Sequence, residues 1–171
     1  MSMDVIGQNP TSETGECFRN NIWWWMPLAD YAVQVGGEIA AQCKGWRFND
    51  GDGLNDAGAK ELARLLQVEP DSGRTAEYAM EYLAAREALP LETCRLCSGS
   101  GVCSDVIAVE YEQTTKLIIG EGHPRKGQIG WCNGCNGVGK TPNFATMYAF
   151  SIENVQEFVA FLRDSGGFEI C

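Results

Sequence analysis

Residues 94–101 read Cys-Arg-Leu-Cys-Ser-Gly-Ser-Gly, and residues 132–139 read Cys-Asn-Gly-Cys-Asn-Gly-Val-Gly. Both segments fit the pattern C-x-x-C-x-G-x-G, with an offset of 38 residues between them (132 − 94). Two residues between cysteines let both thiolates reach one metal ion, and two such pairs supply four tetrahedral ligands for zinc. The glycines fit this interpretation, because the chain must turn sharply with positive φ after each pair.

We therefore predict one structural zinc ion, with four ligands: Cys94, Cys97, Cys132 and Cys135. Four thiolates fill the coordination shell and leave no position for an activated water or a substrate oxygen. Metal binding would then contribute folding free energy, so residues 91–142 should lose order without the metal. The alternative is a pair of disulfides or a redox-active pair of cysteines.

The doubled motif resembles the cysteine-rich zinc domain of DnaJ-type chaperones and related short zinc ribbons. The resemblance covers the two knuckles and the hairpin between them. The chaperone domain has four knuckles and two zinc sites, whereas this chain has two knuckles and one site. The J-domain signature is His-Pro-Asp, but the single histidine lies in the sequence His123-Pro124-Arg125. The resemblance thus implies a zinc ribbon without cochaperone activity.

Residues 134–141 also match the phosphate-loop pattern G-x-x-x-x-G-K-[ST]. A functional phosphate loop follows a buried apolar strand and begins a helix. Residues 127–131 read Gly-Gln-Ile-Gly-Trp, which is not such a strand, and Pro142 follows directly after Thr141. We therefore expect no nucleotide hydrolysis at this segment.

The composition is that of a protein with a substantial core, because 44% of the 171 residues are hydrophobic. This length predicts one compact domain, or a core with a protruding zinc hairpin. The chain has no run of 18 apolar residues and no basic residue before Arg19, so we expect neither a membrane span nor a secretory signal. Eight cysteines without an export signal indicate reduced thiols in the cytoplasm. The cysteines outside the predicted zinc site are Cys17, Cys43, Cys103 and Cys171.

The net charge of −10 argues against nonspecific binding to nucleic acids. Residues 1–90 carry 14 acidic and 7 basic residues, which indicates either an acidic face for a basic partner or a solubilising surface. Residues 116–140 are the local exception, with one acid, Glu121, and four bases: Lys116, Arg125, Lys126 and Lys140. This basic hairpin is the segment that could bind nucleic acid.

Hydrophobic spacing and capping residues predict the fold class α+β. Residues 1–15 show no pattern. We expect helices over residues 27–43, weakened by Gly36 and Gly37, over residues 55–66 with Asn55 or Asp56 as cap, and over residues 75–89. Strands at 106–111 and 116–119 would form the zinc hairpin, and 144–150 would form a later strand. Ser151 would cap a last helix to residue 164, which Gly166 and Gly167 end.

These elements divide the chain into three parts: a helical part with a Trp-rich segment (1–90), an inserted zinc-ribbon hairpin (91–142), and a C-terminal strand and helix (143–171) that complete the core of a single domain. The loop at residues 49–53 also suggests calcium, because Asp50, Asp52 and Glu61 match positions 1, 3 and 12 of an EF-hand. Leu54 and Asn55 do not suit positions 5 and 6, so turn formation and capping explain this loop better.

Three successive tryptophans, Trp23, Trp24 and Trp25, cannot all point in one direction. At least one should therefore be partly exposed and available as a binding anchor. The alternative is that all three cover the core. Together with Arg125 and Lys126 on the hairpin, these tryptophans are our candidate partner-binding residues.

Residues 18–28, followed by Asn49-Asp50-Gly51-Asp52-Gly53-Leu54, look like a family of short uncharacterised proteins of bacteria and their phages. This resemblance implies a small cytoplasmic accessory protein of bacterial or phage origin, and it implies no activity.

We expect a zinc-stabilised, non-enzymatic module that binds another protein, as a regulator or inhibitor of a protein complex. If the gene is phage-borne, the target would be a host defence complex with a basic nucleic-acid channel. One alternative is an enzyme with a spare Cys or Asp site, although a thiol nucleophile needs a base and His123 is the sole histidine. Another is nucleic-acid binding through the basic hairpin. The identity of the partner and the oligomeric state do not follow from the sequence.

Overall fold

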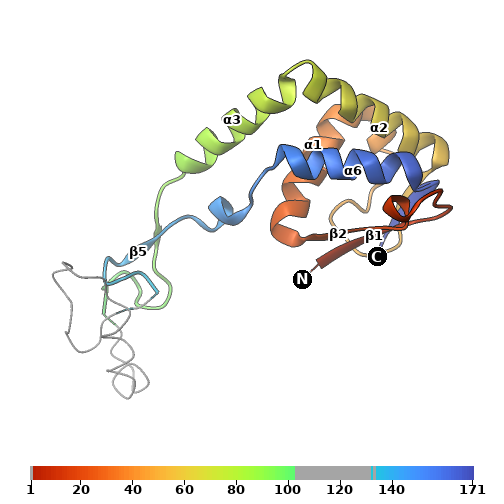
Figure 1. Ribbon diagram of the computed structural model, residues 1–171. Coiled ribbons are helices and arrows are strands. Elements are labelled where there is room, and N and C mark those ends of the chain that lie inside the picture. Colours follow the sequence, from red (N-terminus) through yellow and green to blue (C-terminus); the bar gives the residue numbers. More distant parts are fainter. Residues whose placement is uncertain (1, 103–131, 133) are drawn as a thin grey trace. The chain divides into compact units, whose positions relative to one another are not determined.

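The computed structural model describes residues 2–102, 132 and 134–171. The chain forms two compact units (Figure 1). Unit 1 contains residues Met1–Glu87 and Met147–Cys171, and unit 2 contains Ala88–Thr146. Unit 2 is therefore an insertion into the sequence of unit 1.

Unit 1 contains a four-stranded sheet of β1 (Ser2–Gly7), β2 (Cys17–Asn21), β3 (Gly53–Asn55) and β6 (Gly167–Ile170). The strand order is β2-β1-β6-β3, and all neighbours are antiparallel. A short 3₁₀ turn, η1 (Glu13–Gly15), lies between β1 and β2. The sheet thus joins the two ends of the chain, because Val5 pairs with Ile170.

The prediction that residues 1–15 have no regular structure was wrong for their first half. Met3 and Val5 are buried, with 2% and 0% of their surface exposed, whereas their neighbour Ile6 is 40% exposed. This alternation is the two-residue period of a strand with one buried face. The pairing of β1 with β6 spans almost the whole chain, so local sequence does not reveal it.

Helix α1 (Ile22–Ala40) begins five residues before the predicted start at Pro27. The side chain of Asn21 caps it by accepting hydrogen bonds from the backbone N–H groups of Trp23 (3.0 Å) and Trp24 (3.2 Å). The three tryptophans therefore lie in the first turn of a helix, where they point in different directions. Near its end the helix is kinked at Gly37 (φ 50°), which bears out the predicted weakness there.

The remaining helices of unit 1 are α2 (Asp56–Asp71), α3 (Arg74–Glu87) and α6 (Ile152–Asp164). Helix α2 extends five residues beyond the predicted end, and Asn55 Oδ1 accepts a hydrogen bond from Gly58 N at its start (2.9 Å). The Ser151 hydroxyl caps α6 as predicted, by accepting from Asn154 N at 3.1 Å. Figure 1 shows α2 and α6 side by side, and these two helices contact each other.

The predicted strand at 144–150 was wrong, because Phe144–Met147 form a 3₁₀ turn, η2, and residues 148–150 lie outside the strands of the described part of the chain. Asn143 stabilises the turn, since its side chain accepts a hydrogen bond from Ala145 N (2.9 Å). The strand of the C-terminal part is instead β6, which follows α6. The fold class α+β is confirmed.

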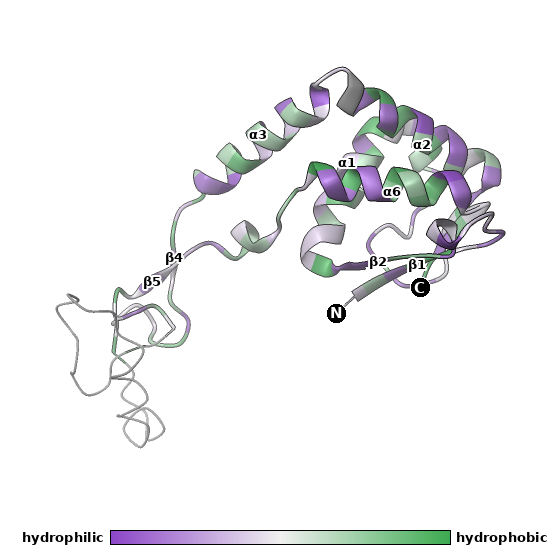
Figure 2. Ribbon diagram, viewed as in Figure 1, coloured by the Kyte–Doolittle hydropathy of each residue, from purple (hydrophilic) through white to green (hydrophobic). Residues whose placement is uncertain are grey.

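Aromatic side chains form the centre of the core of unit 1. Phe158 on α6 is fully buried, and its ring centroid lies 5.1 Å from that of Phe18, 5.8 Å from Trp25 and 6.2 Å from Phe168. These residues come from β2, α1, α6 and β6, so one cluster connects the sheet to the helices. Figure 2 shows the alternation of hydrophobic and hydrophilic residues along the helices that cover it.

In unit 2, the strands β4 (Glu92–Thr93) and β5 (Lys140–Thr141) pair antiparallel, with Thr93 opposite Lys140. The two strands predicted at 106–111 and 116–119 lie outside the described residues. Within the described part of the chain, every helix is too short or too polar to cross a bilayer.

Candidate metal centre

The two C-x-x-C-x-G-x-G segments adopt the same local structure. In the first, Gly99 N donates to Cys94 O at 3.2 Å, and in the second, Gly137 N donates to Cys132 O at 3.0 Å. Both turns continue with a second matching bond, from Ser100 N to Cys97 O and from Val138 N to Cys135 O, each 3.0 Å long. The repeat in the sequence is therefore a repeat in backbone conformation.

Positive φ angles also recur at the offset of 38 residues. Gly99 and Gly137 have φ values of 86° and 72°, and Gly101 and Gly139 have 73° and 80°. The predicted need for glycine at these positions is confirmed. Ser98 (49°) and Asn136 (48°) adopt the same region just before them. The glycine pattern of the sequence does not predict this last pair, although both residues occupy the same place in the repeat.

The two knuckles are joined by reciprocal backbone hydrogen bonds. Cys94 N donates to Gly139 O at 2.9 Å, and Cys132 N donates to Gly101 O at 3.1 Å. The approach is close at the first of these contacts, because a Cβ atom on Gly139 would lie 2.2 Å from the carbonyl oxygen of Gly99. Glycine at 139 is thus required both by its φ angle and by the neighbouring knuckle.

This arrangement brings together the four predicted ligands. Their sulfur atoms all lie within 4.8 Å of one another, and the residues are between 0% and 7% exposed. Across the knuckles, the sulfur atoms of Cys94 and Cys132 are 3.8 Å apart, and those of Cys97 and Cys135 are 3.6 Å apart. Four converging thiols could hold a metal ion, and four sulfur donors at tetrahedral spacing are the ligand set of zinc.

Backbone amides point at two of the sulfur atoms. Gly101 N donates to Cys97 Sγ and Gly139 N donates to Cys135 Sγ, both at 3.2 Å. Burial opposes ionisation of Cys97, but the Gly101 amide and the neighbouring thiols lower its pKa to about 6. Burial, with the neighbouring thiols, raises the pKa of Cys135 to about 12, so this thiol would keep its proton near neutral pH unless a bound cation compensated the charge.

The two competing ligand motifs do not form sites. Lys140 and Thr141, which would complete a phosphate loop, lie in strand β5 and not at the start of a helix. In the calcium-like segment, Asp52 accepts hydrogen bonds from the backbone N–H groups of Lys44 (2.6 Å) and Gly45 (2.8 Å). These donors, with the Gly53 N–H, lower the pKa of the Asp52 carboxyl, so this side chain anchors a loop.

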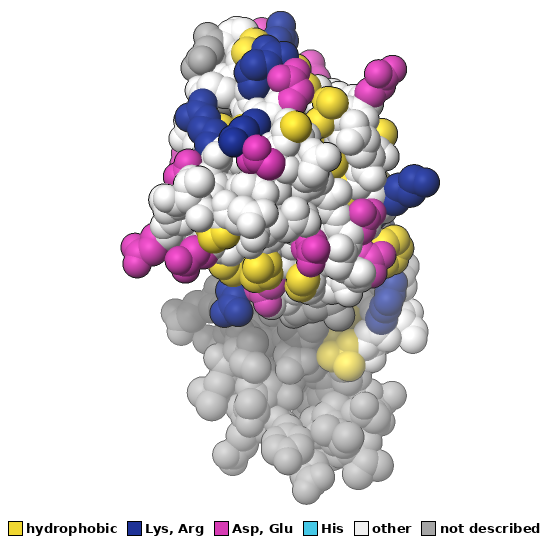
Figure 3. Space-filling view, turned by 90° about the vertical axis from the view of Figure 1, so that its right-hand side faces the viewer, with side chains coloured by type: hydrophobic (Ala, Val, Ile, Leu, Met, Phe, Trp, Pro, Cys, Tyr) yellow, Lys and Arg dark blue, Asp and Glu magenta, His cyan; other side chains and the backbone are white. Residues whose placement is uncertain are grey.

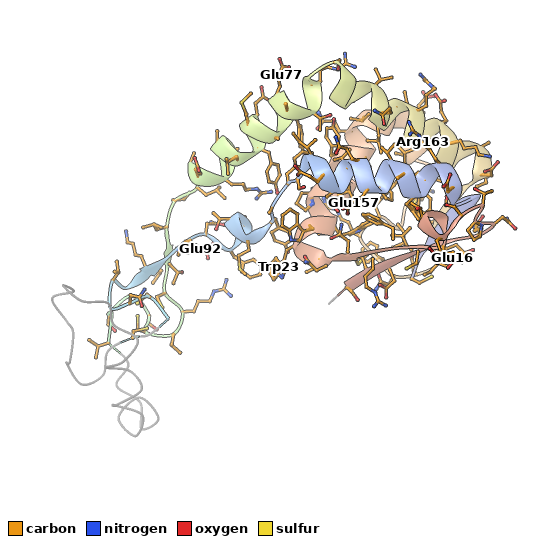
Figure 4. All side chains as sticks on the ribbon, in the orientation of Figure 1. Glu16, Trp23, Glu77, Glu92, Glu157 and Arg163 are labelled. Atoms are coloured by element: carbon orange, nitrogen blue, oxygen red, sulfur yellow. The ribbon has the colours of Figure 1, made fainter. Side chains whose placement is uncertain are left out.

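The three tryptophans differ in environment, and Figure 4 labels the first of them, Trp23. Trp25 is fully buried, and its indole N–H donates to Trp46 O at 2.7 Å. Trp23 is half-buried and meets the ring of Tyr148 edge-on, at 5.0 Å between centroids. Trp24 is 38% exposed, so of the three it presents the largest accessible fraction to a partner.

The described cysteines outside the cluster are all free thiols. Cys17 is exposed on strand β2, Cys171 is exposed at the chain end, and Cys43 is buried. Burial, with the negative charge of Asp52, raises the pKa of Cys43 to about 11, which keeps this thiol protonated and poorly nucleophilic. Cys103, His123, Arg125 and Lys126 lie outside the described residues.

The charge of the chain is divided unevenly between the units. Unit 1 has 18 acidic and 8 basic residues, a net charge of −10, whereas unit 2 has five of each. On the face shown in Figure 3, acidic side chains are scattered among fewer basic ones and do not form one patch. Unit 1 as a whole is therefore the acidic body, and it would attract a basic partner over a range of about 10 Å at moderate salt.

Comparison with known proteins adds no family, because no family model, curated protein or solved structure matches this chain.

Proposed function

We propose that the chain is a zinc-stabilised, non-enzymatic module that binds another protein. The observation that supports this most directly is the closed set of four buried thiols, Cys94, Cys97, Cys132 and Cys135. When bound, zinc would supply the cross-link between two segments that are 38 residues apart. Four thiolates occupy the tetrahedral shell, so the ion would hold structure and would not activate a substrate.

The role of a regulator or inhibitor suits a small chain in which unit 1 is acidic and unit 2 would be cross-linked by a metal ion. Unit 1 carries the whole net charge of −10, which favours a basic partner such as the nucleic-acid channel of a protein complex. A phage-borne inhibitor of a host defence complex, acting in the cytoplasm, is the most specific form of this proposal. The same charge opposes direct binding of unit 1 to nucleic acid.

The enzyme alternative has little support from the described thiols and carboxylates. The Cys43 thiol has a raised pKa, and the Asp52 carboxylate is committed to backbone amides. Cys17 and Cys171 are exposed, but the described residues include no histidine that could act as their base.

Two measurements test the proposal. Metal analysis of protein purified under reducing conditions should give one zinc ion per chain, and its absence would remove the structural argument. Affinity capture of the tagged, zinc-loaded protein from its native host lysate at moderate salt should retain one protein complex in fixed stoichiometry. Recovery of the protein alone would shift the interpretation toward an enzyme or a small-molecule binder.

A further inference from the structure

Helix α3 has one face that packs against the other helices of unit 1 and another that is exposed. Thr75 is fully buried, and Tyr78 and Tyr82 on the same face are half-buried. The Tyr31 hydroxyl lies 2.8 Å from the Thr75 hydroxyl, and the Tyr78 ring centroid lies 4.7 Å from that of Tyr31 on α1. These contacts fix the rotation of α3 and thereby determine which of its residues face outward.

The outward face is apolar along its middle. We define the outer stripe of α3 as Ala76, Met80, Leu83 and Ala84, which are all exposed. Met80 and Leu83 are the largest of these and expose 65% and 58% of their surface. Residues at i, i+4, i+7 and i+8 share one face of a helix, so the four side chains form a continuous strip. Figure 2 shows hydrophobic and hydrophilic residues alternating along α3.

Acidic residues border this stripe. Glu77 and Glu81 are one helical turn apart, and both are exposed on the same flank of the stripe. Glu87 extends the line of the stripe at the end of the helix. Figure 4 shows Glu77 on the side of α3 that points away from the other helices of unit 1.

The two basic residues of α3 each make a contact outside the stripe, and the charge of Arg74 also interacts with that of Glu77. Arg74 forms a salt bridge with Glu69 on α2, and the guanidinium of Arg86 lies 4.6 Å from the centroid of the Tyr82 ring, on the packed face. The outward surface therefore combines apolar anchors with a negative flank. A second copy of the same stripe would bring acidic flanks together in an antiparallel helix pair, so self-association is disfavoured.

We propose that the outer stripe of α3 is a docking surface for a basic amphipathic helix of a partner protein, an inference that rests on the proposed binding function. The partner helix places apolar residues over Met80 and Leu83 and places Lys or Arg beside Glu77 and Glu81. Apolar contact supplies the anchors, and the charges select the partner and its orientation. Binding weakens as salt is added, because the charged flank is exposed to solvent.

The test uses two synthetic peptides of about 18 residues, a length that sustains a helix. Both carry Leu at helical spacing along one stripe, and the flanks carry Lys in one peptide and Glu in the other. Fluorescence anisotropy measures their binding to the full-length, zinc-loaded protein. We expect the Lys peptide to bind and the double variant M80S/L83S to bind it about tenfold or more weakly. The variant E77Q/E81Q should also bind it several-fold more weakly.

Two control variants carry matching substitutions on other surfaces of the protein. Phe48 is 63% exposed in the loop between α1 and β3, so F48S removes a comparable apolar side chain. Glu13 and Glu16 are exposed near β2, so E13Q/E16Q removes the same charge as E77Q/E81Q. Both controls should bind the Lys peptide as the wild type does. Equal binding by M80S/L83S, or equal binding of the Glu peptide, would overturn the proposal.

A fall of several degrees in the melting temperature of M80S/L83S would also overturn it, because the stripe would then be covered within the chain itself. Affinity capture with M80S/L83S separates this proposal from the broader one. Retention of the partner by this variant would refute the α3 surface while leaving the binding function intact. Failure of the wild type to retain any protein, together with no peptide binding, would refute both.

Discussion

The two units bury different kinds of side chain. The core of unit 1 consists of aromatic and aliphatic side chains from four helices and a sheet, whereas among the described residues of unit 2 the buried hydrophobic cluster consists of the four cysteines. Burial of apolar surface stabilises unit 1 through the hydrophobic effect, which needs no ligand. Converging thiolates repel one another, so a cation bound between them would stabilise unit 2. We therefore expect the two units to lose their structure under different conditions.

The largest expected effect is that loss of the metal unfolds unit 2 but leaves unit 1 folded. Replacing Cys94 with Ser should abolish tight zinc binding and unfold unit 2, since structural zinc sites contribute on the order of 10 kcal/mol to folding. Limited proteolysis should then cut within residues 88–146 and leave the remaining two segments associated. The variant C17S, at an exposed cysteine of unit 1, is the control. Unchanged protease resistance of C94S would contradict the expectation that unit 2, unlike unit 1, needs the metal to fold.

The converse variant removes a large side chain from the hydrophobic core of unit 1. Phe158 is fully buried among aromatic rings, so F158A should cost unit 1 about 3–5 kcal/mol. Chemical denaturation would measure this loss, and the zinc content of the folded protein should remain that of the wild type. The exposed Phe48 provides the control, because F48A should change stability by no more than about 0.5 kcal/mol. Loss of zinc from F158A under native conditions would show that the units are not independent.

Substitutions at two glycines distinguish the cost of a positive φ angle from the cost of a steric clash. Gly139 and Gly51 have nearly equal φ angles, 80° and 81°, but only at Gly139 would an added Cβ atom meet another residue, the carbonyl of Gly99. We expect G51A to cost about 1 kcal/mol and G139A to cost more and to weaken zinc binding. Competition with a chromogenic chelator would measure the affinity. Equal zinc affinity of the G139A variant and the wild type would contradict the close contact between knuckles.

A smaller effect concerns the pH dependence of unit 1. Backbone amides lower the pKa of Asp52, so its contribution to stability is present above the ordinary pKa of Asp, about 3.9, and is lost as the pH falls through the lower folded value. D52N should therefore cost about 1–2 kcal/mol at pH 7, and the difference should disappear in strong acid. Thermal melting of D52N and wild type across pH 2–7 would check this. The exposed Glu38 offers the control E38Q.

The sequence predicted the candidate metal centre more completely than it predicted the sheet. Ligand spacing and glycine positions are local properties, so Cys94 and Cys132 could be grouped without any knowledge of the fold. The cap at Ser151 is equally local, and α6 was located correctly. Helix α1 begins before Pro27 because Asn21 caps it, and Asn is among the residues preferred at this position.

The sheet could not be predicted because its pairings are distant in sequence. Strand β1 pairs with β6 at the other end of the chain, and alternation at Met3 and Val5 was the only local indication. Residues 148–150 misled for a different reason. Tyr148 and Phe150 have the aromatic composition of a strand, but their rings pack against Trp23 and Tyr78, and they lie outside the strands of the described residues. Side-chain packing decided their conformation, and composition alone does not report it.

Unit 2 is inserted into the sequence of unit 1, so metal binding in unit 2 would also affect the stability of unit 1. When unit 1 folds, it must close a loop of roughly 60 residues between Glu87 and Met147, and that closure costs chain entropy. Bound zinc, together with the β4–β5 pair, would cross-link the two ends of unit 2, so the number of unconstrained residues in the loop would fall about fourfold. Unit 1 should therefore lose about 1 kcal/mol of stability when a chelator removes the metal, a change measurable by urea titration. The variant C94S/C132S should show no such response to the chelator, and a much larger loss in the wild type would mean that the units share more than a tether.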